Sequence, residues 1–173
     1  YCQGSRALAE HRLVPNRPYY SLLTKLVRYF RGSRGNTSLD VTLHCQGAVN
    51  KTCPDVDGET YDDFGKALDA NSTLRIGSDN PFAAMDDLCD SDVVVTSKSG
   101  FSHLAAVLCE KPIFLYIPFW HSYDCIPNAM PLKVLYGKAR AANITGNLTL
   151  PADFVFDRRT FHDLIFSKVK HII

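Results

Sequence analysis

The sequence predicts an α/β protein with three layers, in which a doubly wound, mainly parallel sheet lies between helices. Short β-branched or apolar runs, typical of buried strands, alternate along the chain with segments whose apolar residues recur every three or four positions. The segment from Asp92 to Pro118 has the order strand, helix, strand, which implies parallel pairing through a right-handed crossover. We expect one Rossmann-like domain over residues 1–173 and, because the chain begins at Tyr1 without a Met, a fragment of a longer protein.

The first half of the chain is predicted to supply one long helix and several short elements. A polar lead-in precedes Asn16, a candidate N-cap, and a helical apolar stripe then runs to Phe30. The turn-forming residues from Gly32 to Asn36 end this helix. Two short strands and one short helix are expected at 39–43, 73–76 and 61–68.

The central unit follows a helix expected to begin near Pro81. Val93 to Val95 form a β-branched run typical of a buried strand, and residues 96–100 are small, polar and turn-forming. Pro112 ends the next helix, and residues 113–117 form the second buried strand. The apolar stripe of that helix is predicted to face the core through Phe101, Leu104, Ala105 and Leu108.

The last third of the chain is less regular. Residues 119–124 form an aromatic loop after the second buried strand. Residues 132–136 fit either a strand or a helical turn, and Pro151 to Phe154 lead into a last helix near 157–173.

The turn between strand and helix in the central unit carries the candidate chemistry. Ser97 or Ser99 caps the helix, whose first N–H groups have no partner inside the helix. Free N–H donors, hydroxyls and the positive end of the helix dipole make such a turn an anion site, to which Lys98 adds a cation. The alternative is that the serines only cap the helix and Lys98 faces water.

Two further groups are candidates for a ligand cleft. His44 and Gln46 follow a predicted strand at its carboxyl end, although Gly47 there also fits a simple turn. Trp120 and His121 lie in the aromatic loop, where rings stack on bases or sugars or else cover the core. No metal site is predicted, because the chain has no Cys-x-x-Cys pair and its Asp-x-Asp triplets lie in loops typical of the surface.

Several patterns predict a location in the secretory pathway, either in the Golgi or ER lumen or outside the cell. A net charge of +1 gives no reason to expect a nucleic-acid partner, and a membrane would be reached only through a segment outside this sequence. The six cysteines favour disulfides: Cys45 and Cys53 flank a short loop, whereas Cys89 and Cys109 fit a buried pair of free thiols equally well. Sequons for N-glycosylation are found at Asn36, Asn50, Asn71, Asn143 and Asn147.

Three segments resemble one known family. They are Arg12-Leu-Val-Pro-Asn-Arg-Pro-Tyr-Tyr, the strand that ends in His44-Cys-Gln-Gly, and Ser91-Asp-Val-Val-Val-Thr-Ser-Lys-Ser-Gly-Phe-Ser-His-Leu-Ala. Together they resemble the C-terminal, donor-binding half of fucosyltransferase-like glycosyltransferases of the GT-B type, over roughly residues 10–120.

The resemblance implies a nucleotide-sugar donor of the GDP-fucose type, bound without an essential metal or other cofactor, and a glycan or glycoprotein acceptor. It places Arg12 near the donor diphosphate, where a guanidinium neutralises leaving-group charge. No catalytic base is identified, because the acceptor half of such enzymes is not part of this sequence. A non-catalytic secreted α/β module that binds a glycan, a nucleotide or a protein is the alternative. The residues that the resemblance implies for the diphosphate site are Ser97, Ser99, Gly100, Phe101 and Ser102, to which the turn itself adds Lys98 as a cation that the family does not require.

Overall fold

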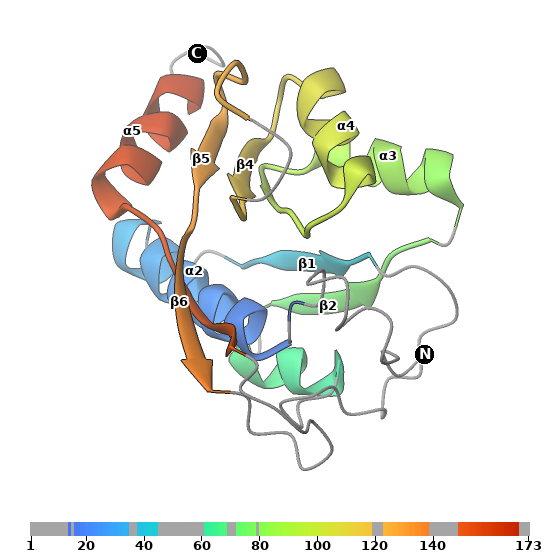
Figure 1. Cartoon of the computed structure of the whole chain (residues 1–173). Coiled ribbons are helices and arrows are strands. Elements are labelled where there is room, and N and C mark those ends of the chain that lie inside the picture. The colour runs from blue at the N-terminus through green and yellow to red at the C-terminus, as the bar shows by residue number, and fades with distance from the viewer. Residues whose placement is uncertain are drawn as a thin grey trace. The chain divides into compact units, whose positions relative to one another are not determined.

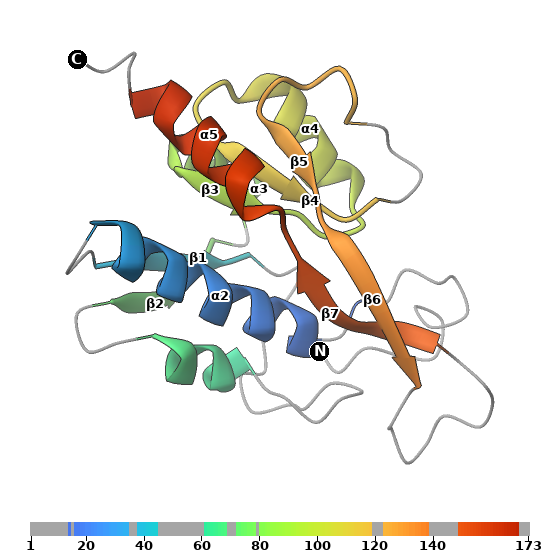
Figure 2. The ribbon, with the colours of Figure 1, turned by 90° about the vertical axis from the view of Figure 1, so that its left-hand side faces the viewer.

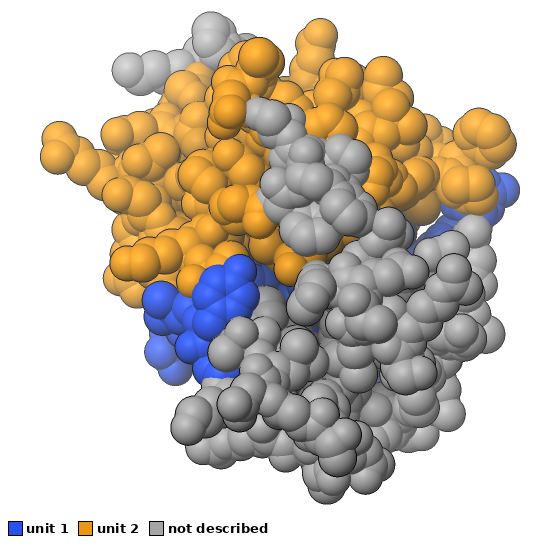
Figure 3. All heavy atoms as spheres, viewed as in Figure 1, with its two compact units in different colours: residues 1–80, 135–154 blue, residues 81–134, 155–173 orange. Residues whose placement is uncertain are grey.

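The computed structural model places most of the chain in two compact units, which are described separately. The first unit covers residues 1–80 and 135–154, and the second covers 81–134 and 155–173 (Figure 3). The structure describes residues 14, 16–34, 38–44, 61–68, 72–78, 80–118, 123–138 and 149–169.

The first unit contains one long helix and two small sheets (Figure 1). β1 pairs with β2 in parallel, from Asp40 opposite Thr73 to Leu43 opposite Ile76. β6 pairs with β7, and Figure 2 shows their arrows pointing in opposite directions. The elements are α2 (Asn16–Arg34), β1 (Asp40–Leu43), the 3-10 helix η1 (Tyr61–Ala67), β2 (Thr73–Ile76), β6 (Lys133–Lys138) and β7 (Thr149–Val155), of which β6 begins and β7 ends in the second unit.

Helix α2 is tied to strand β7 by packing and by charge. The ring of Tyr19 meets the buried ring of Phe154 edge-on, with centroids 5.1 Å apart. The ammonium group of Lys25 donates to both carboxylate oxygens of Asp153, at 2.7 and 2.8 Å, and to the Phe154 carbonyl at 2.7 Å. Burial alone would raise the pKa of Asp153, but hydrogen bonds from Lys25 and Ser21 and the charge of Lys25 hold this pKa below its usual value.

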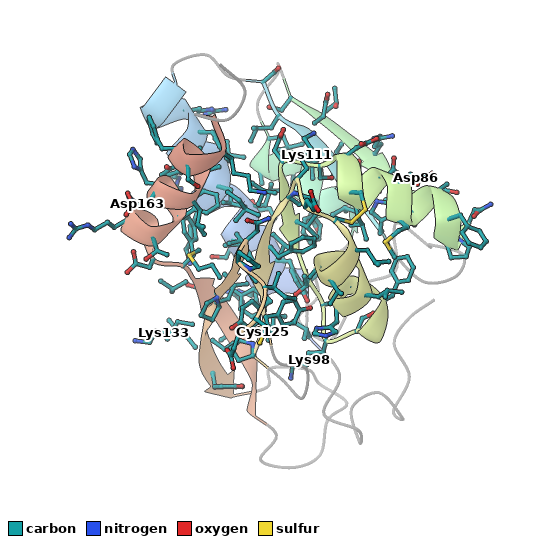
Figure 4. The ribbon with its side chains drawn as sticks, turned by 90° about the horizontal axis from the view of Figure 1, so that it is seen from above. Asp86, Lys98, Lys111, Cys125, Lys133 and Asp163 are labelled. Carbon is teal, nitrogen blue, oxygen red and sulfur yellow. A yellow bond between two sulfur atoms is a disulfide. The ribbon has the colours of Figure 1, made fainter. Side chains whose placement is uncertain are left out.

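The second unit is built on a short parallel sheet with strand order β3-β4-β5. All four residues of β4, from Ile113 to Tyr116, are buried, as expected for the middle strand of such a sheet. Helices α3 and α4 lie on one side of this sheet and α5 lies on the other (Figures 2 and 4). The elements are α3 (Pro81–Asp90), β3 (Val93–Val95), α4 (Gly100–Leu108), β4 (Ile113–Tyr116), β5 (Ala129–Pro131) and α5 (Arg158–Val169).

The buried face of α4 differs from the predicted one. Of the predicted stripe only Ala105 is buried, whereas Leu104 is 47% exposed and Leu108 is 60% exposed. Ser102 and Ala106 complete the buried face of the helix. The reason is that the sheet already supplies large side chains to this core, so the helix approaches it with its small residues. The core cluster here consists of Val94, Ala105, Ala106, Cys109, Phe114, Tyr116 and Tyr123.

A disulfide fixes the same two helices to each other. Cys89 in α3 is bonded to Cys109, which ends α4. From the sequence, Cys89 and Cys109 could equally form a disulfide or remain buried free thiols. The structure contains the disulfide. Cys125 is a free, exposed cysteine, and the proposed partners Cys45 and Cys53 lie outside the described residues.

Helix α5 is anchored to the second unit at its last turn and at its core. The ammonium group of Lys168 donates to the carbonyl of Lys111 at 2.7 Å and to that of Glu110. Phe161 is fully buried and packs edge-on against Phe156, with ring centroids 5.1 Å apart. The helix therefore belongs to the second unit, although residues 135–154, which precede it in the sequence, belong to the first unit.

The mixed α/β class and its parallel strand pairs are confirmed. Residues 132–136, for which two conformations were predicted, lie largely in strand β6, and the expected lead-in from Pro151 to Phe154 is part of strand β7. Strand β5 was not predicted at all. Among the helices of the described residues, none combines the length and the apolar character needed to cross a bilayer.

Candidate functional site

The candidate site is the turn from Thr96 to Ser99 in the second unit. It follows β3 directly, and the Thr96 N–H continues the ladder by donating to the Leu115 carbonyl of β4 at 2.9 Å. Helix α4 begins at Gly100. The turn therefore lies at the carboxyl end of a parallel sheet and at the N-terminus of a helix, the place where α/β proteins bind ligands.

Ser99 is the residue that caps α4. Its backbone is extended, with φ −133° and ψ 136°, and its Oγ accepts a hydrogen bond from the Phe101 N–H at 3.1 Å. The Ser99 N–H in turn donates to the Ser97 carbonyl at 2.9 Å. The sequence allowed either Ser97 or Ser99 as the cap, and the structure shows that Ser99 is the cap. Ser97 is exposed.

Ser102 supports the turn from inside. It is buried, and its hydroxyl donates to the carbonyls of Ser97, at 3.2 Å, and of Ser99, at 3.0 Å. This hydroxyl is committed to the protein. Gly100 is an exposed residue, and its N–H is one of the first groups of the helix, which have no acceptor inside the helix. The candidate donors of the turn for an anion are therefore the Gly100 N–H and the Ser97 hydroxyl.

Lys98 supplies the positive charge. Its side chain is half-buried in the turn, and this burial lowers the pKa of its ammonium group. Figure 4 shows Lys98 at the same end of the unit as Cys125. Phe101 is partly exposed beside the turn, so that an apolar ring borders the donors. A bound anion would interact more strongly with a partly desolvated ammonium group than with one in bulk water.

A cluster of rings lies in the core of the second unit. Tyr116, the last residue of β4, stacks on Tyr123 with centroids 4.2 Å apart and an angle of 6° between the planes. His103 of α4 meets Tyr123 edge-on at 4.8 Å. Tyr123, which lies in the predicted aromatic loop, is thus buried in this core.

The other predicted site residues lie in the first unit or outside the described residues. His44 lies at the end of β1 in the first unit, against Gly77, whose N–H donates to the Leu43 carbonyl at 2.8 Å. Arg12, Gln46, Trp120 and His121 lie outside the described residues, as do the sequons at Asn36, Asn50, Asn71, Asn143 and Asn147.

Potential metal ligands do not gather anywhere in the described part of the chain: no group of three or more His, Cys, Asp or Glu side chains is placed to hold an ion. The segment 96–102 itself contains no acidic residue or histidine. What the turn offers chemically is a set of hydrogen-bond donors and one cation, which suits an anion held directly by protein groups.

Comparisons with protein-family models, with curated protein sequences and with solved structures find no significant match to this chain.

Proposed function

We propose that the chain is the donor-binding part of a glycosyltransferase and binds the diphosphate of a GDP-fucose-type donor at the turn from Ser97 to Phe101. The observation that carries the proposal is the open N-terminus of α4 at the carboxyl end of β3, with the half-buried Lys98 beside it. A Rossmann-like, three-layer arrangement of the complete domain belongs to the same proposal.

The chemistry of sugar transfer fits these groups. When the bond from the sugar to the diphosphate breaks, negative charge builds up on the departing phosphate oxygen. The Gly100 N–H, the Ser97 hydroxyl and the Lys98 ammonium group would stabilise that charge at fixed positions and without a metal. Arg12 would add a second cation, as the family resemblance implies.

A non-catalytic binding module is the second candidate. It is favoured by the composition of the turn, because residues 96–102 include no carboxylate or imidazole that could act as a general base. The same turn would then hold a phosphate group or a nucleotide without transferring it.

Calorimetric titration of the chain with GDP, GDP-fucose and UDP, with and without a chelator, tests the proposal. We expect guanine-selective binding that survives the chelator and weakens at least about tenfold in a Ser97→Ala/Lys98→Gln variant. Ser167→Ala, which removes an exposed serine of α5, is the matched control and should bind like the wild type.

Absence of binding for all three nucleotides would contradict the proposal. Binding of GDP-fucose that is turned over to GDP and a fucosylated acceptor would favour the enzyme, whereas binding with no transfer to any glycan acceptor would favour the binding module.

A further inference from the structure

Every exposed residue of helix α4 is a glycine or an apolar residue. The helix contains no Asp, Glu, Lys or Arg, and its four large exposed side chains are between 37% and 61% exposed. A surface helix normally presents charged or polar side chains on the face opposite the core. The exposed face of α4 is therefore a candidate contact surface for another molecule. Its residues are Gly100, Phe101, Leu104, Val107 and Leu108.

These five residues are arranged symmetrically about Leu104. Gly100 and Leu108 lie four residues before and after it, and Phe101 and Val107 lie three residues before and after it. Because positions three and four apart share one face of a helix, the five residues form one stripe with Leu104 at its centre.

Such a stripe can bind a second copy of itself. When two copies of α4 lie antiparallel with their Leu104 side chains in contact, Gly100 of each copy faces Leu108 of the other. In the same pair, Phe101 of each copy faces Val107 of the other. A larger side chain thus meets a smaller residue at each of these steps, and each contact occurs twice, as in a contact on a twofold axis.

The charges at the two ends of α4 are also complementary. The turn before the helix, residues 96–99, carries Lys98 and no carboxylate. The other end has more acid than base, with three carboxylates and two ammonium groups. Antiparallel pairing places the positive end of each helix beside the negative end of the other, and the helix dipoles have the same signs. The groups at the negative end are Asp90, Asp92, Glu110, Lys111 and Lys168, of which Lys111 pairs with Asp92 at 3.6 Å and Lys168 donates to the Glu110 and Lys111 carbonyls.

We propose that the exposed stripe of α4 binds the same stripe of a second copy of this chain, in an antiparallel, twofold-symmetric contact centred on Leu104. The face of one short helix is smaller than the roughly 800 Å² per partner that is typical of stable complexes. The dimer is therefore weak, with a Kd on the order of 100 μM.

The contact includes part of the candidate site. Gly100 and Phe101 belong both to the stripe and to the turn that is proposed to bind a diphosphate. In the dimer, the negative end of the partner lies beside this turn and opposes a bound anion. GDP should therefore favour the monomer. This coupling rests on the proposed function, whereas the self-association does not.

Sedimentation equilibrium of the whole chain, at concentrations up to about 1 mM, measures the association. All proteins carry Cys125→Ser, so that this exposed free thiol cannot link two copies. Leu104→Glu tests the contact, because it places two like charges on the twofold axis. Phe166→Glu is the matched control, since Phe166 is similarly exposed but belongs to α5 on the other side of the sheet (Figures 2 and 4).

We expect Leu104→Glu to weaken dimerisation at least about tenfold and Phe166→Glu to leave it unchanged. Charge reversal tests the antiparallel orientation. Lys98→Glu should weaken the dimer roughly threefold to tenfold, because carboxylates then meet at both ends of the pair. Adding Glu110→Lys to Lys98→Glu should restore the association.

A wild type that stays monomeric at about 1 mM would overturn the inference. Equal dimerisation of Leu104→Glu and Phe166→Glu would do the same, and a failure of Glu110→Lys to restore the association would overturn the antiparallel orientation. If the dimer forms but GDP does not bind, the self-association is supported and the proposed function fails. If GDP binds and leaves the dimer unchanged, the proposed function is supported and the coupling fails.

Discussion

Lys98 shows how a single side chain couples the candidate site to pH. Burial disfavours its charged form and lowers its pKa below the usual 10.5. A diphosphate binds best to the ammonium form, so binding should weaken as pH rises through the lowered pKa of the unliganded protein. The loss therefore begins at a lower pH than an exposed lysine would give.

The prediction is that GDP affinity, measured by calorimetry from neutral pH upward, declines earlier in the wild type than in Lys98→Arg. Arginine stays protonated over this range, and titration of GDP itself is common to both proteins and cancels in the comparison. Lys98→Gln should bind GDP about tenfold more weakly at neutral pH. Its affinity should not show the early decline with rising pH that is expected of the wild type. Equal pH profiles for the wild type and Lys98→Arg would show that Lys98 does not contact the ligand.

Gly77 is a second position where one residue decides local structure. A Cβ at this position would overlap the imidazole ring of His44, which lies against the glycine at the ends of β1 and β2. Gly77→Ala should therefore force the ring away and destabilise the protein by about 1–2 kcal/mol in urea unfolding.

The contact with His44 can be separated from the backbone effect of the substitution. In a His44→Ala background, Gly77→Ala should cost only a few tenths of a kcal/mol, because the overlapping ring is gone. If Gly77→Ala costs the same in both backgrounds, the close approach of His44 is not the reason for the glycine.

At the scale of the elements, α4 shows both the strength and the limit of pattern analysis. Its position was predictable, since a small polar turn, a helical repeat and Pro112 define its two ends. The face of α4 that is buried was not predictable, because hydrophobic periodicity assigns the largest apolar side chains to the core. Here the rings of Tyr116 and Tyr123 fill that core, and the helix contributes Ser102, Ala105 and Ala106.

The disulfide between Cys89 and Cys109 joins the ends of α3 and α4, and it closes a loop of 20 residues. In the chain-entropy account a loop of this length gives about 3 kcal/mol of stability. The Cys89→Ala/Cys109→Ala variant should lose about that amount in urea unfolding, with faster amide exchange in α3 and α4.

Cys125→Ser is the control for that variant, since Cys125 is exposed and free. It should leave the unfolding midpoint unchanged. A reducing agent should lower the midpoint of the wild type and of Cys125→Ser by the same amount, and that of the double alanine variant by less. Insensitivity of the wild type to reduction would mean that the bridge is absent in solution.

At the scale of the molecule, the sequence predicted the α/β class and the turn after β3, because both depend on short-range patterns. Residues 92–118 contain strand, cap, helix and strand in one continuous run, and each part has its own local signal. The division into two units had no such signal, because it depends on contacts that join α2 to β7 and α5 to the loop after α4. Tyr123 reaches the rings of Tyr116 and His103 in the same way, through the fold rather than through spacing.

The cellular location is the property of the whole molecule that both sequence and structure address. The disulfide from Cys89 to Cys109 is typical of an oxidising compartment, and the five sequons predict glycosylation there. When the chain is expressed behind a secretory signal in a eukaryotic cell, we expect a glycoprotein whose mass falls on treatment with an amidase that removes N-glycans. Asparagine-to-glutamine changes at Asn36, Asn50, Asn71, Asn143 and Asn147 should each remove one step of that mass difference. A secreted, folded chain with no glycan at any of these positions would contradict the predicted location, because accessible sequons are modified during passage through the ER.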